Sequence, residues 1–168
     1  PGVRRWAVRL APTANVPVTS LSGLTQDTSA RVRLELACIV GQYHEATRIL
    51  SDLLLSDPDP WLQAAVMSSL NIENISVTID EFSRVVRNDA SANDPSVSKM
   101  AGFTAADRDE LTSILFGQAA SIVSPDDLRR ILMLTVDAPH GELQAWQLKS
   151  LAVMLDHLAP RSESVADQ

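Results

Sequence analysis

The residues with the most chemical potential lie in the stretch DPDPWLQAAVMSSL, residues 57–70, where two aspartates precede a tryptophan. Paired carboxylates beside a stacking aromatic would suit a metal site, because hard cations prefer oxygen ligands. A calcium loop also needs a glycine and a closing glutamate at fixed spacing, and this stretch has neither. The same residues make a good helix start, with Asp59 as N-cap, Pro60 as the first helical residue and Asp57 near the positive end of the dipole. We interpret the stretch as a helix start.

Cys38 is the only cysteine, so neither an internal disulfide nor a cysteine-based metal cage can form within this chain. It lies mid-helix among apolar residues, which predicts a buried small side chain rather than a nucleophile. His44, His140 and His157 lack the spacing that puts two metal ligands on one helix face. No glycine-rich phosphate loop or Ser-His-Asp signature is visible. We therefore predict no catalytic residue, no cofactor and no metal site.

Acidic residues also gather where helices are expected to begin, where they complement helix dipoles before they need a metal. They are Asp107, Asp109, Glu110, Asp126 and Asp127. The net charge of −7 over 168 residues argues against nucleic-acid binding, which depends on Lys and Arg neutralising phosphates. No apolar run is long enough to cross a bilayer, so direct membrane insertion is not expected. The first residue is proline, which suggests a processed chain or a piece of a larger protein.

The elements that would position these residues form a repeat. Three segments align, namely VRRWAVRLA from Val3, VRLELACIVG from Val32 and LQAAVMSSL from Leu62, so the steps are 32 − 3 = 29 and 62 − 32 = 30 residues. Each has apolar residues on one helical face. The low aromatic content of 4% also favours stacked helices. We divide residues 1–89 into repeats at about 2–28, 29–58 and 59–89, and we expect Trp61 to pack against the neighbouring repeat.

Each repeat is expected to contain a second helix. The clearest covers residues 46–55, whose apolar positions share one face. Gly41 is expected to end the helix before it in the left-handed conformation. The equivalent in the first repeat, about Val18 to Thr25, is weaker because it contains Gly23. In the third repeat we expect a helix over 79–88 that begins with a capping box formed by Thr78 and Glu81.

After this the repeat fades. Residues 90–104 are expected to form an irregular linker or loop, since they are rich in Ser, Asn and Pro. Residues 105–160 should add further helices of the same solenoid. These begin with capping residues at Thr104 and Ser124, and the last runs from Gly141 to Leu158. Residues 161–168 are expected to be a frayed tail.

The first helices carry a family resemblance. Asp27, Val32, Arg33, Ala37 and Gly41 match the HEAT-type pattern Asp-x-x-Val-Arg-x-x-Ala-small-x-apolar-Leu-Gly, as does Leu36. The resemblance implies an all-α fold: a right-handed α-α superhelix, or armadillo-like solenoid, of about four to five helix pairs. In such repeats the arginine commonly bonds an acidic residue of an adjacent turn. Arg4 and Arg33 supply it here, but the third repeat has Gln63, so the ladder is expected to weaken there.

More narrowly, VRRWAVRL, ARVRLELACIVGQ, DPWLQAAVMSSL and AWQLKSLAVML resemble the helical-repeat region of large planctomycete proteins described as membrane-bound dehydrogenases. That region lies between a sugar-dehydrogenase-like propeller and a c-type haem module with a Cys-x-x-Cys-His motif. This chain has no such motif, so haem attachment is not carried over. The resemblance implies a connecting solenoid, exported with its parent.

Two sets of residues could bind a protein partner. The arginine cluster Arg4, Arg5, Arg9, Arg31 and Arg33 would either pair internally with Asp27, Asp57 and Glu35 or form a docking strip for an acidic partner. The polar positions of the second helices, Arg48, Asp52, Arg84 and Arg87, are expected to face the concave surface. Our leading hypothesis is a non-catalytic scaffold that binds a protein or a neighbouring domain of its parent. The rival is an accessory domain of a propeller and haem oxidoreductase, with a site formed only in the full chain.

Overall fold

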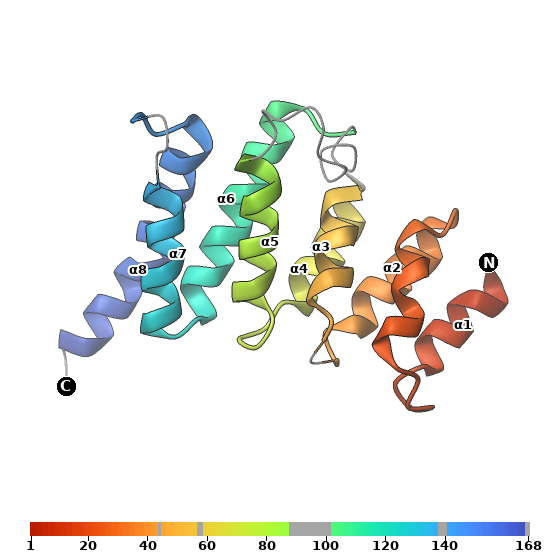
Figure 1. Ribbon diagram of the computed structural model, residues 1–168. Helices are drawn as coiled ribbons and strands as arrows, with labels where there is room; N and C mark the ends of the chain where they lie inside the picture. Colours follow the sequence, from red (N-terminus) through yellow and green to blue (C-terminus); the bar gives the residue numbers. More distant parts are fainter. Residues whose placement is uncertain (44, 57–58, 88–101, 138–140, 167–168) are drawn as a thin grey trace. The chain divides into compact units, whose positions relative to one another are not determined.

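All the regular secondary structure in the part of the chain that the computed structural model describes is helical, which confirms the all-α class (Figure 1). It describes the backbone of residues 1–43, 45–56, 59–87, 102–137 and 141–166, and the side chains of these ranges except 85–87 and 159–166. The chain divides into two compact units, Pro1–Gly102 and Phe103–Gln168, which are considered separately. Within the described ranges, no helix combines the length and apolarity needed to cross a bilayer.

The first unit contains two kinds of helix in alternation, as the repeat predicts. The first helices of the three repeats are α1 (Gly2–Leu10), α2 (Ala30–Val40) and α4 (Pro60–Ser69). The second helices are η1 (Val18–Gln26), α3 (Thr47–Ser56) and α5 (Ile75–Arg87). Helix α2 packs against both α1 and α4, while α3 packs against both η1 and α5 (Figure 1). The unit therefore has two layers, one of first helices and one of second helices.

The core of this unit lies where the layers meet. The side chains of Val32, Leu36, Ala37 and Val40 in α2 are almost completely buried. Helix α3 buries apolar residues on more than one side because it contacts second helices at both flanks and α2 and α4 behind it. Its buried apolar residues are Ile49, Leu50, Leu53, Leu54 and Leu55. The 3₁₀ helix η1 replaces an α-helix in the first repeat, where the segment VTSLSGLTQ is poor in helix formers.

Helix starts in the first unit are partly as predicted. Asp59 is the N-cap of α4, and its Oδ1 accepts a hydrogen bond from the Trp61 backbone N–H at 2.8 Å, so the helix-start interpretation is confirmed. The predicted capping box of Thr78 and Glu81 is wrong. Helix α5 already begins at Ile75, and the hydroxyl of the buried Thr78 donates to the Asn74 carbonyl one turn earlier.

The start of α5 is instead held by two asparagines that bond each other. Asn71 Oδ1 accepts from the backbone N–H groups of Glu73 and Asn74, and Asn74 Oδ1 accepts from the Asn71 N–H at 2.9 Å. These bonds act as a capping box made from amides. The Asn74 side chain also donates to the Ser69 carbonyl, which ties the end of α4 to the start of α5. The spacing Asn71-x-x-Asn74 was the sequence signal for this start.

Gly41 has a different role from the predicted one. Its φ of −60° and ψ of −15° are right-handed, so no left-handed turn requires a glycine there. A Cβ at this position would lie 2.7 Å from the Ser69 carbonyl oxygen and 3.0 Å from the Ser69 Cβ. At the same seam the Ser69 hydroxyl donates to the Ala37 carbonyl at 2.6 Å. Gly41 is needed because α2 and α4 approach each other closely at their carboxyl ends.

The second unit contains α6 (Ala105–Ile122), α7 (Pro125–Val136) and α8 (Ala145–Ala166), with α8 packed mainly along α6. The predicted caps are confirmed. Thr104 and Asp107 form a reciprocal capping box at the start of α6, and the Ser124 hydroxyl accepts from the Asp127 N–H at the start of α7. The Phe116 and Trp146 rings meet edge to face, with centroids 6.4 Å apart.

A buried amide joins α7 to α8. The Gln147 side-chain NH₂ donates to the Thr135 and Asp137 carbonyls at 2.7 and 2.8 Å, and its oxygen accepts from the Gln144 N–H at 2.8 Å. This one side chain therefore satisfies carbonyls at the end of α7 and an N–H group at the start of α8. Helix α8 extends to Ala166, beyond the expected end at Leu158 and into the segment 161–168 that was expected to be frayed.

Two parts of the predicted domain division stay predictions. Most of the expected linker 90–104 lies outside the described residues, although Thr104 is the N-cap of α6. The first helices of the expected repeats 2–28, 29–58 and 59–89 are present. Whether residues 105–160 continue the same solenoid stays a prediction, because those residues belong to the second unit.

The contact at Gly41 gives a stability prediction. Gly41→Ala should lower the free energy of unfolding of the first unit by about 1–3 kcal/mol, because the new Cβ must push the Ser69 backbone away. Gly23→Ala is the matched control, since a Cβ there meets nothing within 4 Å, and its effect should stay within about 0.5 kcal/mol. The measurement is urea unfolding followed by circular dichroism. A Gly41→Ala protein as stable as the wild type would contradict the close approach.

Candidate functional site

The arginines of α1 bond carboxylates in α2 and in the segment that precedes it. Arg4 donates from Nε to Asp27 Oδ2 at 2.7 Å and from Nη2 to Asp27 Oδ1 at 3.1 Å, which is a bidentate pair. Asp27 Oδ1 also accepts from the Ser29 N–H, and the Asp27 carbonyl accepts from Arg33 Nη1 at 2.7 Å. Asp27 therefore links α1 to α2 through its carboxylate and its carbonyl. The hydrogen bonds from Arg4 and from the Ser29 N–H lower the pKa of its carboxyl.

Glu35 in α2 is shared by two arginines of α1. It accepts from Arg9 Nε at 2.6 Å, from Arg9 Nη2 at 3.1 Å and from Arg5 Nε at 2.8 Å. The Glu35 side chain is buried, whereas the two arginine side chains are about half exposed. The hydrogen bonds from Arg9 outweigh the effect of burial and hold the Glu35 pKa below its ordinary value.

These contacts confirm internal pairing for Arg4, Arg5 and Arg9 with Asp27 and Glu35. The arginine ladder implied by the HEAT resemblance stays a prediction beyond the pair of Arg4 with Asp27. Its second step would join Arg33 to Asp57, which lies outside the described residues. Use of the same arginines as a docking strip stays a prediction, since each guanidinium keeps an exposed side.

A groove of about 500 Å³ runs between η1 and α3, on the layer of second helices. Its floor contains the buried Val18 and Ile49, and polar side chains lie around them. The groove contains both predicted interaction residues of α3. Its lining residues are Val18, Thr19, Ser22, Gly23, Glu45, Arg48, Ile49 and Asp52. A groove with an apolar floor and a polar edge can hold an extended segment of protein.

Arg48 and Asp52 are one helical turn apart, so both reach this groove from α3. Arg48 is exposed and has no ion pair or hydrogen-bond partner within the described part of the chain. Thr19, Ser22 and Glu45 were missed by sequence reasoning. The sequence carried no signal for them, because the groove depends on how η1 lies beside α3.

The predicted interaction residues fall on two layers rather than one surface. Arg84 lies on α5, the second helix next to α3, and is exposed while its Nη2 donates to Glu81 Oε1 at 2.6 Å. Arg87 is the last residue of α5, and its side chain lies outside the described residues. Arg4, Arg5 and Arg9 belong to α1, in the layer of first helices. Of the seven residues, the groove contains Arg48 and Asp52.

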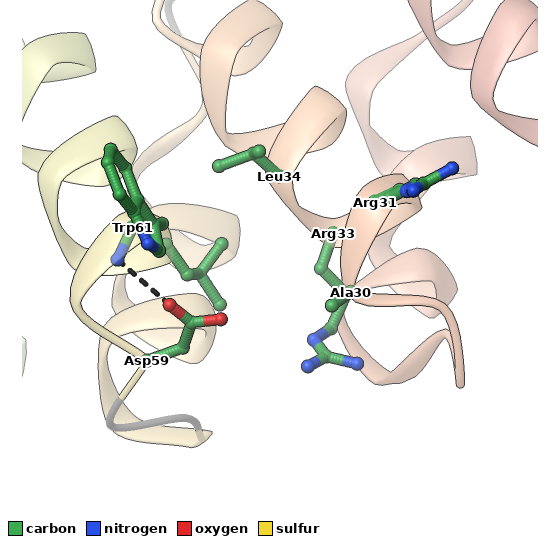
Figure 2. A pocket seen from close by; sticks show the side chains of 7 residues that line it. Ala30, Arg31, Arg33, Leu34, Asp59 and Trp61 are labelled. Carbon is green, nitrogen blue, oxygen red and sulfur yellow. Dashed lines mark hydrogen bonds between the residues drawn. The ribbon is translucent and has the colours of Figure 1, made fainter.

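Trp61 does not pack into the neighbouring repeat as expected, because its side chain is 78% exposed. It stands at the mouth of a small pocket of about 160 Å³ between the amino ends of α2 and α4. Figure 2 shows Trp61 and Leu34 facing each other across this pocket, with Asp59 below the indole. The prediction failed because Trp61 is the second residue of α4, on the side that α2 leaves open.

The prediction of a buried Cys38 is also wrong, since Cys38 is exposed on α2. It occupies the outward side of a helix whose buried residues are Val32, Leu36, Val40 and their neighbours. Partial desolvation, followed by the negative charge of Glu35, raises the pKa of its thiol. This favours the protonated thiol over the reactive thiolate. Among the described side chains, no three His, Cys, Asp or Glu residues are grouped to hold a metal ion.

Comparison with protein-family models, curated proteins and solved structures returned no match for this chain. The case for the HEAT resemblance therefore consists of the residues and contacts described above.

The lowered pKa values of Glu35 and Asp27 predict how stability varies with pH. Because each folded value lies below the unfolded one, the ion pairs stabilise the protein above the ordinary carboxyl pKa of about 4. That stabilisation is lost as the pH falls through the lowered folded values. Glu35→Gln should therefore reduce the free energy of unfolding on the order of 1 kcal/mol at neutral pH. The difference from wild type should disappear in acid.

The measurement is urea unfolding at a series of pH values from neutral to strongly acidic. Glu45→Gln is the matched control, because Glu45 is exposed and has no ion pair within the described residues. A constant difference between Glu35→Gln and wild type at all pH values would contradict the proposed ionic contribution of Glu35.

Proposed function

We propose that the chain is a non-catalytic protein-interaction module, built as a HEAT-like right-handed superhelix of helix pairs. The groove between η1 and α3 binds a segment of a partner protein or of a neighbouring domain. Stacked helix pairs suit this function because their second helices form an extended surface along the stack.

Three features support the HEAT-like architecture. The first helices recur at steps of 29 and 30 residues, and first and second helices stack in separate layers. Arg4 bonds Asp27 in the turn before α2, as HEAT-type arginines commonly bond an acidic residue of an adjacent turn. Gly41 allows the close approach of successive first helices.

The observation that carries the function is Arg48 in the groove. A guanidinium with no partner in the described part of the chain, beside an apolar floor, is available to bond the carbonyls or carboxylates of an incoming segment. The groove also offers Glu45 and Asp52, so its charge is mixed rather than uniformly basic. A mixed groove fits a peptide with donors and acceptors better than a phosphate backbone, in keeping with the net charge of −7.

The test is selection of a phage-displayed random peptide library against the purified chain. We expect enriched peptides whose affinity falls at least about 10-fold on Arg48→Glu, since removal of a central guanidinium costs more than 1 kcal/mol. Affinities are measured by fluorescence anisotropy with the synthetic peptides.

Arg129→Glu is the matched control, because it makes the same charge change at an exposed arginine of α7 in the second unit. It should leave the affinity within about two-fold of wild type. Failure to enrich any peptide, or peptides equally sensitive to both variants, would overturn the proposed function of the groove.

A further inference from the structure

Helix α1 has an apolar face that no other described element covers. Val3, Trp6 and Leu10 are 85%, 60% and 55% exposed, and the spacing i, i+3, i+7 places them on one side of the helix. Three large apolar side chains exposed together on a nine-residue helix form a patch rather than scattered residues. The face is therefore a candidate interaction surface.

The repeat identifies what kind of structure covers such a face. At the steps of 29 and 30 residues, the three positions of α1 correspond to Val32, Glu35 and Ile39 in α2 and to Leu62, Ala65 and Ser69 in α4. All six of these side chains are 9% exposed or less. The positions whose side chains are exposed in α1 are thus buried in both α2 and α4.

Two sets of hydrogen bonds show which element covers these positions in α2 and α4. Glu35 accepts hydrogen bonds from Arg5 and Arg9 of α1, so its position faces the preceding first helix. Ser69 donates to the Ala37 carbonyl of α2, so its position also faces the preceding first helix. The equivalent residues of α1 are Trp6 and Leu10. In α2 and α4 these positions contact the preceding first helix. One more α-helix could therefore pack on this face of α1 as α1 packs on α2.

The charges beside this face specify the partner further. Arg9 neighbours Trp6 on the helix, and its guanidinium carbon is 5.1 Å from the centroid of the Trp6 ring. Arg5 and Arg9 share the single carboxylate of Glu35, which leaves one positive charge in excess. Helix α1 itself contains three arginines and no acidic residue. Like charges would meet if α1 paired with α1 of a second copy, whereas carboxylates on a partner would be attracted.

We propose that the Val3, Trp6 and Leu10 face of α1 binds an amphipathic α-helix that residues 1–168 do not supply, with an apolar stripe against this face and acidic residues along the edge near Arg9. The proposal rests on the proposed function in that the partner is again a protein segment. The binding face, however, lies on the layer of first helices and not at the groove that contains Arg48. The two sites can be tested independently.

The probe is a synthetic helical peptide of about 18 residues with leucines at i, i+3 and i+7 and glutamates on the flanks. A second peptide, with lysines in place of the glutamates, is the charge-reversed control. We expect the glutamate peptide to bind the chain at least about 10-fold more tightly than the lysine peptide. Trp6→Ser combined with Leu10→Ser should weaken its binding by a further factor of about 10. Binding is measured by fluorescence anisotropy of the labelled peptide.

Trp61→Ser is the matched control, because Trp61 is also an exposed tryptophan but lies on α4. It should leave the affinity unchanged, as should Arg48→Glu, so failure of the groove and failure of this face are distinguishable. Absence of binding, equal affinity for both peptides or equal loss in Trp61→Ser would overturn the proposal. Sedimentation of the chain alone shows whether it forms a dimer. A dimer that Trp6→Ser dissociates would overturn the proposal and assign this face to a second copy of the chain.

Discussion

The first unit depends on the burial of α2 between two other first helices. A single amphipathic helix pair cannot bury its apolar faces by itself, so each pair is stable only against its neighbours. Helix α2 contacts α1 on one flank, α4 on the other, and η1 and α3 in the second layer. Val32, Leu36 and Val40 are almost completely buried as a result. Every other element of the unit is positioned directly or through one neighbour by this helix.

Helix α2 packs against α1 and α4 through different kinds of contact. Towards α1 the seam is ionic, because Glu35 accepts hydrogen bonds from two arginines. Towards α4 the seam uses small residues, with Gly41 close to the Ser69 backbone and the Ser69 hydroxyl bonded to the Ala37 carbonyl. The ionic seam allows α1 to keep an uncovered apolar face beside cationic side chains. Helix α1 therefore combines an uncovered apolar face with cationic side chains, which is the composition that the proposed partner helix requires.

Local features of the fold could be predicted because they need few residues. Caps at Asp59, Thr104 and Ser124 involve partners two or three residues away, and the repeat follows from periodic apolar positions. The predictions that failed depend on which side of a helix meets a neighbour. The exposure of Cys38 and Trp61 follows from the orientation of α2 and α4, which the apolar pattern of those helices leaves poorly defined. The role of Gly41 likewise follows from a contact with Ser69, 28 positions along the chain (69 − 41).

The candidate sites were predictable to a similar extent. Arg48 and Asp52 were expected on one surface because they are polar positions of a second helix, but the groove itself needs η1 beside α3. The pairing of α1 with Glu35 could be expected from charge, whereas the open face of α1 became apparent only when buried positions of α2 and α4 were compared with it.

Native-state hydrogen exchange of the backbone amides tests the central position of α2 most directly. If α2 is the element on which the stack depends, its amides should exchange only when the whole first unit unfolds, whereas α1 should exchange earlier through local release. Exchange of α2 as fast as α1, or faster than α4, would contradict this account of the fold.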